Sequence, residues 1–152
     1  MESFYSSTPC PFLAWKQYLP DTPYSDCSPI IPLITSATAF IKKDTKLVSR
    51  DELFEQRFFL LDFEKLSSDA ELLGDWPSLG EELEDRTERV CGVFGLAMHH
   101  MVSSEKVEGD ENNTFPIVRA RIVNHLVFTQ LKQLKSSYFQ RLVTIQGTVV
   151  RV

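Results

Sequence analysis

The hydrophobic pattern of residues 128–152 changes its period from that of a helix to that of a strand. Apolar side chains first recur at helical spacing, at Leu131, Leu134, Tyr138, Phe139 and Leu142. This spacing predicts an amphipathic helix of about three turns. From residue 143 onward apolar and polar side chains alternate, which predicts a half-buried strand over residues 143–152. A strand needs neighbours for its backbone hydrogen bonds, so we expect this one to open a second domain and the chain to be a piece of a longer protein.

Helical spacing upstream predicts a small helical bundle. The expected helices cover residues 12–19, 29–43, 51–57, 75–84 and 87–102. The last of these is the most apolar, and we expect it to be the central helix. It contains Gly92 and Gly95, each of which costs about 1 kcal/mol relative to alanine inside a helix. Their presence predicts that another element packs closely against this helix.

Two short apolar runs predict strands rather than helices. Phe58–Phe63 is too short for a core helix, and Ile117–Val123 alternates imperfectly between apolar and polar residues, so both are expected to be strands. Because both are short and flank the helical core, we expect them to pair. Asp62, near the end of the first run, is expected to cap the turn that follows it rather than to act in catalysis. The predicted fold class is therefore mainly α, a helical bundle with a short β pair.

The composition is that of a globular protein, with 43% hydrophobic and 11% aromatic residues. Apolar runs fall short of the roughly 18 residues that a membrane-spanning helix needs, so no membrane contact is expected. The three cysteines, Cys10, Cys27 and Cys91, are odd in number and widely spaced. This pattern indicates a reducing compartment rather than a disulfide framework.

Charge is distributed unevenly along a chain whose net charge is −5. Acidic residues crowd residues 51–88, and none follows Glu111. The segment after Glu111 carries only cations: Arg119, Arg121, Lys132, Lys135, Arg141 and Arg151. Such side chains bind phosphate without reading sequence, so this charge distribution permits a DNA-facing end, and the six cations are the candidate DNA-proximal residues. The alternative interpretation is that each charged run is a solvated face.

Two kinds of site are not indicated by the sequence. None of the glycines precedes a Lys-Ser or Lys-Thr pair, so the chain has no Walker A motif and no NTP-hydrolysing centre is expected. No Cys-x-x-Cys pair is present, and His99 and His100 point in different directions on a helix, so no metal site and no catalytic residues are predicted.

The residues also carry a resemblance to a known family. The run Leu131–Val152 is joined by five shorter pieces in matching order: Trp15–Leu19, Tyr24–Pro29, Leu60–Leu66, Gly95–His99 and Val118–Ile122. Together they resemble the N-terminal region of the minichromosome-maintenance (MCM) DNA helicases. Within that family they look most like the eighth paralogue, a recombination-associated subunit.

The resemblance implies a domain organisation and a function. Residues 1–11 would be a flexible lead-in, residues 12–142 the helical N-terminal subdomain, and residues 143–152 the first strand of an oligonucleotide-binding (OB-fold) barrel. The chain would be the structural and assembly part of a nuclear, hexameric, ATP-dependent helicase subunit that acts in homologous recombination and crosslink repair. Its implied partners are the ninth MCM paralogue in a mixed ring, DNA through the barrel, and loader proteins; ATP, Mg and Zn are implied for the parent protein and none for these residues.

Two other classes of function stay open from the sequence. One is an autonomous protein-interaction module that uses its acidic 51–88 surface to bind a basic partner. The other is a small enzyme that uses His99 or Asp62.

Overall fold

The described part of the chain is mainly helical. The structure is a computed structural model and describes residues 12, 14–25, 27–43, 49–103 and 115–150. The expected lead-in, residues 1–11, lies outside the described residues. The helices are α1 (Trp15–Tyr18), α2 (Ile30–Lys43), α3 (Arg50–Gln56), α4 (Phe63–Ser68), α5 (Ala70–Asp75), α6 (Leu79–Asp85) and α7 (Thr87–Ser103). The strands are β1 (Phe58–Asp62) and β2 (Arg119–Val123), and two 3-10 turns follow, η2 (Leu131–Gln133) and η3 (Ser136–Tyr138).

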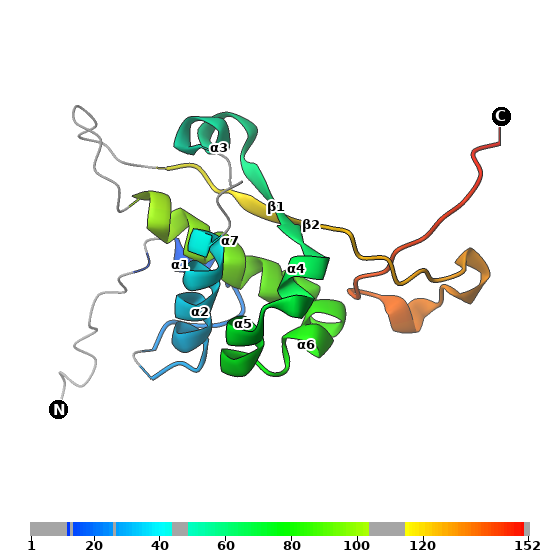
Figure 1. Cartoon of the computed structure of the whole chain (residues 1–152), viewed down its shortest axis with the longest axis horizontal. Coiled ribbons are helices and arrows are strands. Elements are labelled where there is room, and N and C mark those ends of the chain that lie inside the picture. The colour runs from blue at the N-terminus through cyan, green and yellow to red at the C-terminus, as the bar shows by residue number, and fades with distance from the viewer. Residues whose placement is uncertain (1–11, 13, 26, 44–48, 104–114, 151–152) are drawn as a thin grey trace.

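Helix α7 is the central element, as its sequence predicts. The strand pair lies along one side of it, while α2 and α6 pack on the other side and α5 packs against α2 (Figure 1). Its residues Val90, Val93, Phe94, Leu96 and Ala97 are fully buried. A helix that is buried on most of its circumference requires neighbours all round, and here helices and strands supply them.

The two glycines of α7 mark close approaches, which confirms the expectation from the sequence. A Cβ atom on Gly92 would overlap the backbone carbonyl oxygen of Tyr18 in α1. A Cβ on Gly95 would lie 2.7 Å from the Tyr18 ring and 3.2 Å from the carbonyl oxygen of Val118. Glycine is therefore required at both positions for α1 and the approach to β2 to pack on α7.

The strands β1 and β2 pair as expected from the sequence, and the pairing is parallel. The register places Phe58 beside Arg119 and Leu60 beside Arg121. Phe59 and Leu61 are buried against the core, with exposed fractions of 0% and 2%, whereas Leu60 is 50% exposed. Because side chains alternate between the two faces of a sheet, Phe58, Leu60, Arg119 and Arg121 share the other face. We call these four residues the outer face.

The helices α4 and α5 were not expected from the sequence. Each buries one large residue, Leu66 in α4 and Leu72 in α5, so neither shows a helical period. Aspartate caps start both: Asp62 accepts a hydrogen bond from the backbone N–H of Glu64 at 2.9 Å, and Asp69 accepts one from Leu72 at 3.0 Å. The expected capping role of Asp62 is thus confirmed.

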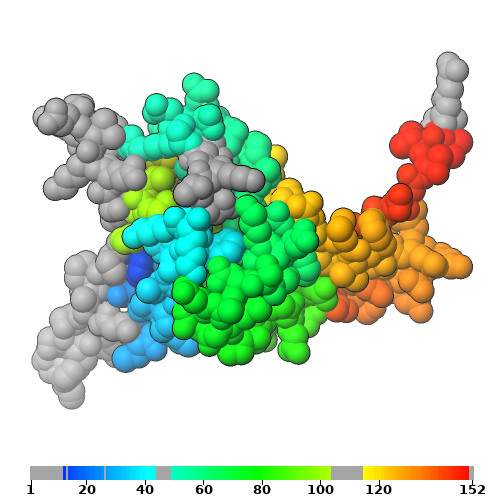
Figure 2. All heavy atoms as spheres, in the orientation of Figure 1, coloured from blue at the N-terminus to red at the C-terminus, as the bar shows by residue number. Residues whose placement is uncertain are grey.

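The prediction of an amphipathic helix through Leu131–Leu142 is wrong. The structure has only η2 and η3 there, and Leu131 and Phe139 are 54% and 78% exposed. A short helix is stable in water only when its apolar side packs against something. Leu142 packs against the core, but the exposed Leu131 and Phe139 do not. Figure 2 shows this segment extending away from the packed body.

The strand expected over residues 143–152 is likewise not formed in the described residues, which end at 150. Thr144 makes a single isolated bridge to Phe128, and Val149 is 96% exposed. A strand requires a neighbouring strand along its length, and one bridge does not supply it. The OB-fold strand and the domain boundary after residue 142 remain predictions. Within the described residues, no helix combines the length and the apolarity needed to cross a membrane.

We expect Gly92→Ala to destabilise the fold although alanine favours helices. The new methyl group would overlap backbone rather than a movable side chain, and such overpacking costs about 1–3 kcal/mol. Urea unfolding monitored by circular dichroism measures the change. The matched control is Gly80→Ala in α6, where a Cβ meets nothing within 4 Å, and there stability should stay equal or rise. Equal behaviour of the two variants would contradict the close-packing account.

Candidate functional site

The structure divides the predicted DNA-proximal cations into two groups. Arg119 and Arg121 are exposed on β2, whereas Lys132, Lys135 and Arg141 lie on the segment that leaves the body after β2 (Figure 1). Arg151 lies outside the described residues. The cations therefore do not form one continuous basic patch among the described residues.

Three of these cations are placed differently from one another. The Arg121 guanidinium carbon lies 3.8 Å from the centroid of the Phe58 ring, a cation–π contact. Arg141 pairs with Asp85 at 2.9 Å and lies 5.6 Å from the Tyr138 ring centroid. Lys132 is exposed in η2, and the described residues 115–150 contain no Asp or Glu. Much of the charge of Arg141 is thus engaged by Asp85, while that of Lys132 faces solvent.

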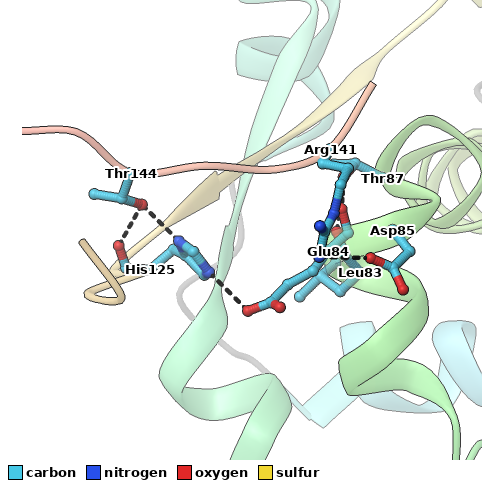
Figure 3. A network of polar contacts seen from close by, with 7 residues as sticks. All are labelled: Leu83, Glu84, Asp85, Thr87, His125, Arg141 and Thr144. Atoms are coloured by element: carbon cyan, nitrogen blue, oxygen red, sulfur yellow. Dashed lines mark hydrogen bonds and ion pairs between the residues drawn. The ribbon is translucent and has the colours of Figure 1, made fainter. Parts of the chain in front are cut away.

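A cluster of polar side chains connects the segment after β2 to α6 (Figure 3). His125, which follows β2 and is 7% exposed, lies between Thr144 and Glu84. The Thr144 hydroxyl donates to the carbonyl oxygen of His125 at 2.6 Å. A hydroxyl has one proton, and that of Thr144 is used in this bond. The Thr144 hydroxyl oxygen therefore accepts from Nδ1–H of the His125 ring at 2.5 Å. We call Glu84, His125 and Thr144, with Asp85 and Arg141 beside them, the junction.

The other ring nitrogen of His125 completes the tie to α6. Nε2 lies 3.3 Å from Oε1 of Glu84; because the proton of the neutral ring is on Nδ1, Nε2 donates to this carboxylate only in the protonated imidazole, and the contact is then an ion pair. The Phe63 ring packs edge-on against the His125 ring, with centroids 4.7 Å apart. The imidazole is therefore held by a hydroxyl, a carboxylate and an aromatic ring from three different parts of the chain.

Backbone hydrogen bonds reinforce the junction. The N–H of Leu142 donates to the carbonyl oxygen of Glu84 at 2.9 Å, and the N–H of Thr129 donates to that of Thr144 at 2.7 Å. The last carbonyls of a helix lack partners within the helix, so the Leu142 N–H satisfies one such group at the end of α6. The junction thus fixes residues 141–144 against the helical body.

The junction was not predicted from the sequence. His125 pairs with residues 19 and 41 positions away, and no local pattern encodes such distances. The sequence instead drew attention to His99, which the structure places in a buried structural cluster. The only local signal at His125 is a polar residue between a strand and an apolar run.

The cluster around His99 joins α1, α7 and the approach to β2. The Tyr18 hydroxyl accepts from the N–H of Val118 at 2.7 Å and lies 3.3 Å from Nδ1 of His99. Burial raises the pKa of Tyr18 to about 12, although the Val118 hydrogen bond and the nearby Arg119 oppose this shift. Burial also lowers the pKa of His99, with a smaller contribution from His100, against the opposing hydrogen bond to the Pro116 backbone. His99 is 6% exposed, so its neutral imidazole accepts from the Tyr18 hydroxyl inside the packed core.

Acids of the 51–88 segment are used within the fold in several places. Asp62 caps α4 and accepts from the Asn124 amide at 3.0 Å, and Glu82 accepts hydrogen bonds from Trp76 and Ser78. Asp69 caps α5, and its Oδ1 lies 3.6 Å from Nζ of Lys43. These contacts reduce the free charge that the proposed interaction module would present. Among the described residues, no group of three His, Cys, Asp or Glu side chains is arranged to hold a metal ion.

Comparisons with known proteins identify relatives of this chain. The family model described as MCM8, N-terminal domain matches residues 31–125. The chain is 33% identical to the DNA helicase MCM8 of Xenopus laevis and 31% identical to those of Homo sapiens and Bos taurus, with 93% of this chain covered in each case. The chain spans 18–19% of the length of these relatives.

Stability is expected to fall as the pH drops below about 6.5, the pKa of an unfolded-state histidine. Because the folded pKa of His99 is lowered, the unfolded state binds the proton more readily, so His99 contributes its full stability above that pH and loses it below. The slope attributable to one group is at most about 1.4 kcal/mol per pH unit. The free energy of unfolding, measured by urea titration between roughly pH 5 and 7, should depend less steeply on pH in His99→Gln than in the unaltered chain. An unchanged slope in that variant would exclude His99 as the origin.

Proposed function

The chain belongs to the MCM8 N-terminal domain family, and from that premise we propose that it is the structural and assembly subdomain of a hexameric, ATP-dependent DNA helicase subunit. One observation carries the proposal. The family match over residues 31–125 begins in α2, ends at His125 and contains all of α7 and the strand pair. The match therefore includes most of the packed core rather than one isolated motif.

The cellular role is proposed from the family resemblance. The subunit would act in the nucleus in homologous recombination and DNA crosslink repair, in a mixed ring with the ninth MCM paralogue. The relatives named DNA helicase MCM8 support the helicase part of this proposal. In this proposal ATP, Mg and Zn are bound by parts of the parent protein other than these residues.

The junction suggests how the subdomain would contribute to ring geometry. If residues 143–152 form the first strand of an OB-fold barrel in the parent protein, that strand starts beside the Thr144 tie. His125 and Glu84 would then set the orientation of the helical body relative to the barrel. An assembly role requires such a fixed connection, because a loose linker would let the two parts reorient freely.

Lys132 and Lys135 are the residues proposed to lie nearest DNA. Both are exposed, and neither is within ion-pair distance of an acid in the described part of the chain. Phosphate contacts of this kind position nucleic acid without specifying its sequence. Arg141 would contribute less, because Asp85 already pairs with it.

We expect the chain alone to bind single-stranded DNA weakly and with a steep salt dependence. Replacing two phosphate-contacting lysines should flatten the plot of log affinity against log salt by about 1.4, since each single-strand contact contributes about 0.7. Fluorescence anisotropy with Lys132→Ala/Lys135→Ala measures the slope. The control is Lys16→Ala/Lys42→Ala, two exposed lysines on helices α1 and α2. Nanomolar, salt-insensitive binding, or an equal effect of the control pair, would contradict the assignment.

The assembly role is tested in the full-length protein together with the ninth MCM paralogue. His125→Phe keeps an aromatic ring beside Phe63 but removes buried hydrogen bonds, each worth about 1–3 kcal/mol when a partner is left unsatisfied. We expect a smaller fraction of complete rings by mass photometry and slower strand displacement. The matched control is His100→Phe. The His100 ring packs on the Phe12 ring, with centroids 4.8 Å apart, outside the junction. Normal ring assembly by His125→Phe would contradict the proposed role of the junction.

A further inference from the structure

The outer face of the strand pair combines exposed apolar surface with two cations. Leu60 is 50% exposed at the middle of β1, and its register partner is Arg121. Phe58 is half-buried and pairs with Arg119 in the same way. An exposed leucine in the middle of a strand, flanked by two arginines, is not required by the fold, because the buried side of the strands already supplies the core contacts.

The charges on the outer face are not neutralised within the described chain. Neither Arg119 nor Arg121 is within ion-pair distance of an acid among the described residues. The acid on the same face is Asp62, whose two carboxylate oxygens accept from Glu64 and Asn124. A cationic face on a chain of net charge −5 is therefore available for an anionic partner.

The Phe58 ring distinguishes between the possible anionic partners. Proteins that bind single-stranded nucleic acid stack bases on the open faces of aromatic rings. One face of Phe58 is already occupied by the Arg121 guanidinium at 3.8 Å, and the remaining apolar side chain, Leu60, is aliphatic and offers no ring for stacking. An aliphatic side chain next to two guanidinium groups suits a peptide that carries both apolar and acidic residues.

We propose that the outer face, Phe58, Leu60, Arg119 and Arg121, docks an acidic segment of a partner protein that also carries an apolar side chain. Arg119 and Arg121 are two residues apart on one strand, which separates them by roughly 7 Å along the strand. Carboxylates at alternate positions of an extended segment have the same spacing. Each guanidinium donates two hydrogen bonds to such a carboxylate in a bidentate geometry, while Leu60 contacts the apolar residue of the segment.

The test starts from a library of random linear peptides displayed on phage and selected against the intact 152-residue chain. Enriched peptides are synthesised with a fluorescent label and titrated by anisotropy. The variants are Arg119→Glu/Arg121→Glu and Leu60→Ser on the outer face, and Lys16→Glu/Lys42→Glu on α1 and α2 as a control with the same change of charge elsewhere. Circular dichroism verifies that each variant keeps its fold, which is expected because all these side chains are exposed. Labelled oligothymidine is titrated in parallel.

The expected result is enrichment of peptides with Asp or Glu beside Leu, Ile or Phe. Their affinity should fall about tenfold or more in Arg119→Glu/Arg121→Glu, fall also in Leu60→Ser, and stay unchanged in the control. No enrichment, or enrichment of peptides without acids, would overturn the proposal. An equal loss of peptide affinity in both charge-reversed variants would also overturn the proposal, because the peptides would then respond only to the net charge of the chain. If the arginine variant loses oligothymidine but still binds the peptides, the outer face is a DNA surface instead.

Discussion

The close approach of Tyr18 to α7 is the contact on which the rest of the body depends. Gly95 leaves room for the Tyr18 ring, and the Tyr18 hydroxyl accepts the N–H of Val118 just before β2. His99, on the same side of α7, lies within hydrogen-bond distance of that hydroxyl. One tyrosine therefore positions α1, α7 and the start of β2 together. Val118 leads directly into β2, whose parallel pairing with β1 forms the outer face.

The junction performs the corresponding task at the other end of β2. There the chain leaves the packed body, and few apolar contacts remain to hold it. Glu84 of α6 acts twice, through its carboxylate toward His125 and through its carbonyl toward Leu142. Polar contacts of this kind are directional, so they fix an orientation where hydrophobic contact would only hold two surfaces together. This property is the reason to connect the junction with the proposed assembly role.

The sequence predicted those parts of the fold whose information is local. The central helix and its close-packed glycines, α2, and the two strands that pair were all expected from period, length and composition. The short helices α4 and α5 were missed because each buries a single large side chain. The helix expected through Leu131–Leu142 failed because an amphipathic pattern specifies a helix only when a surface covers its apolar side. For the site, the sequence named the cations but neither their division into two groups nor the junction, since those depend on contacts between distant residues.

The most direct test of the account is the hydrogen-exchange protection of two backbone amides, Leu142 and Thr129. These donate to Glu84 and Thr144 across the junction, outside any regular helix or strand. Exchange measured by NMR on the intact chain should show both amides protected, and His125→Phe should remove that protection while the amides of α7 keep theirs. Rapid exchange of Leu142 and Thr129 in the unaltered chain would contradict the account, because residues 141–144 would then move independently of the helical body.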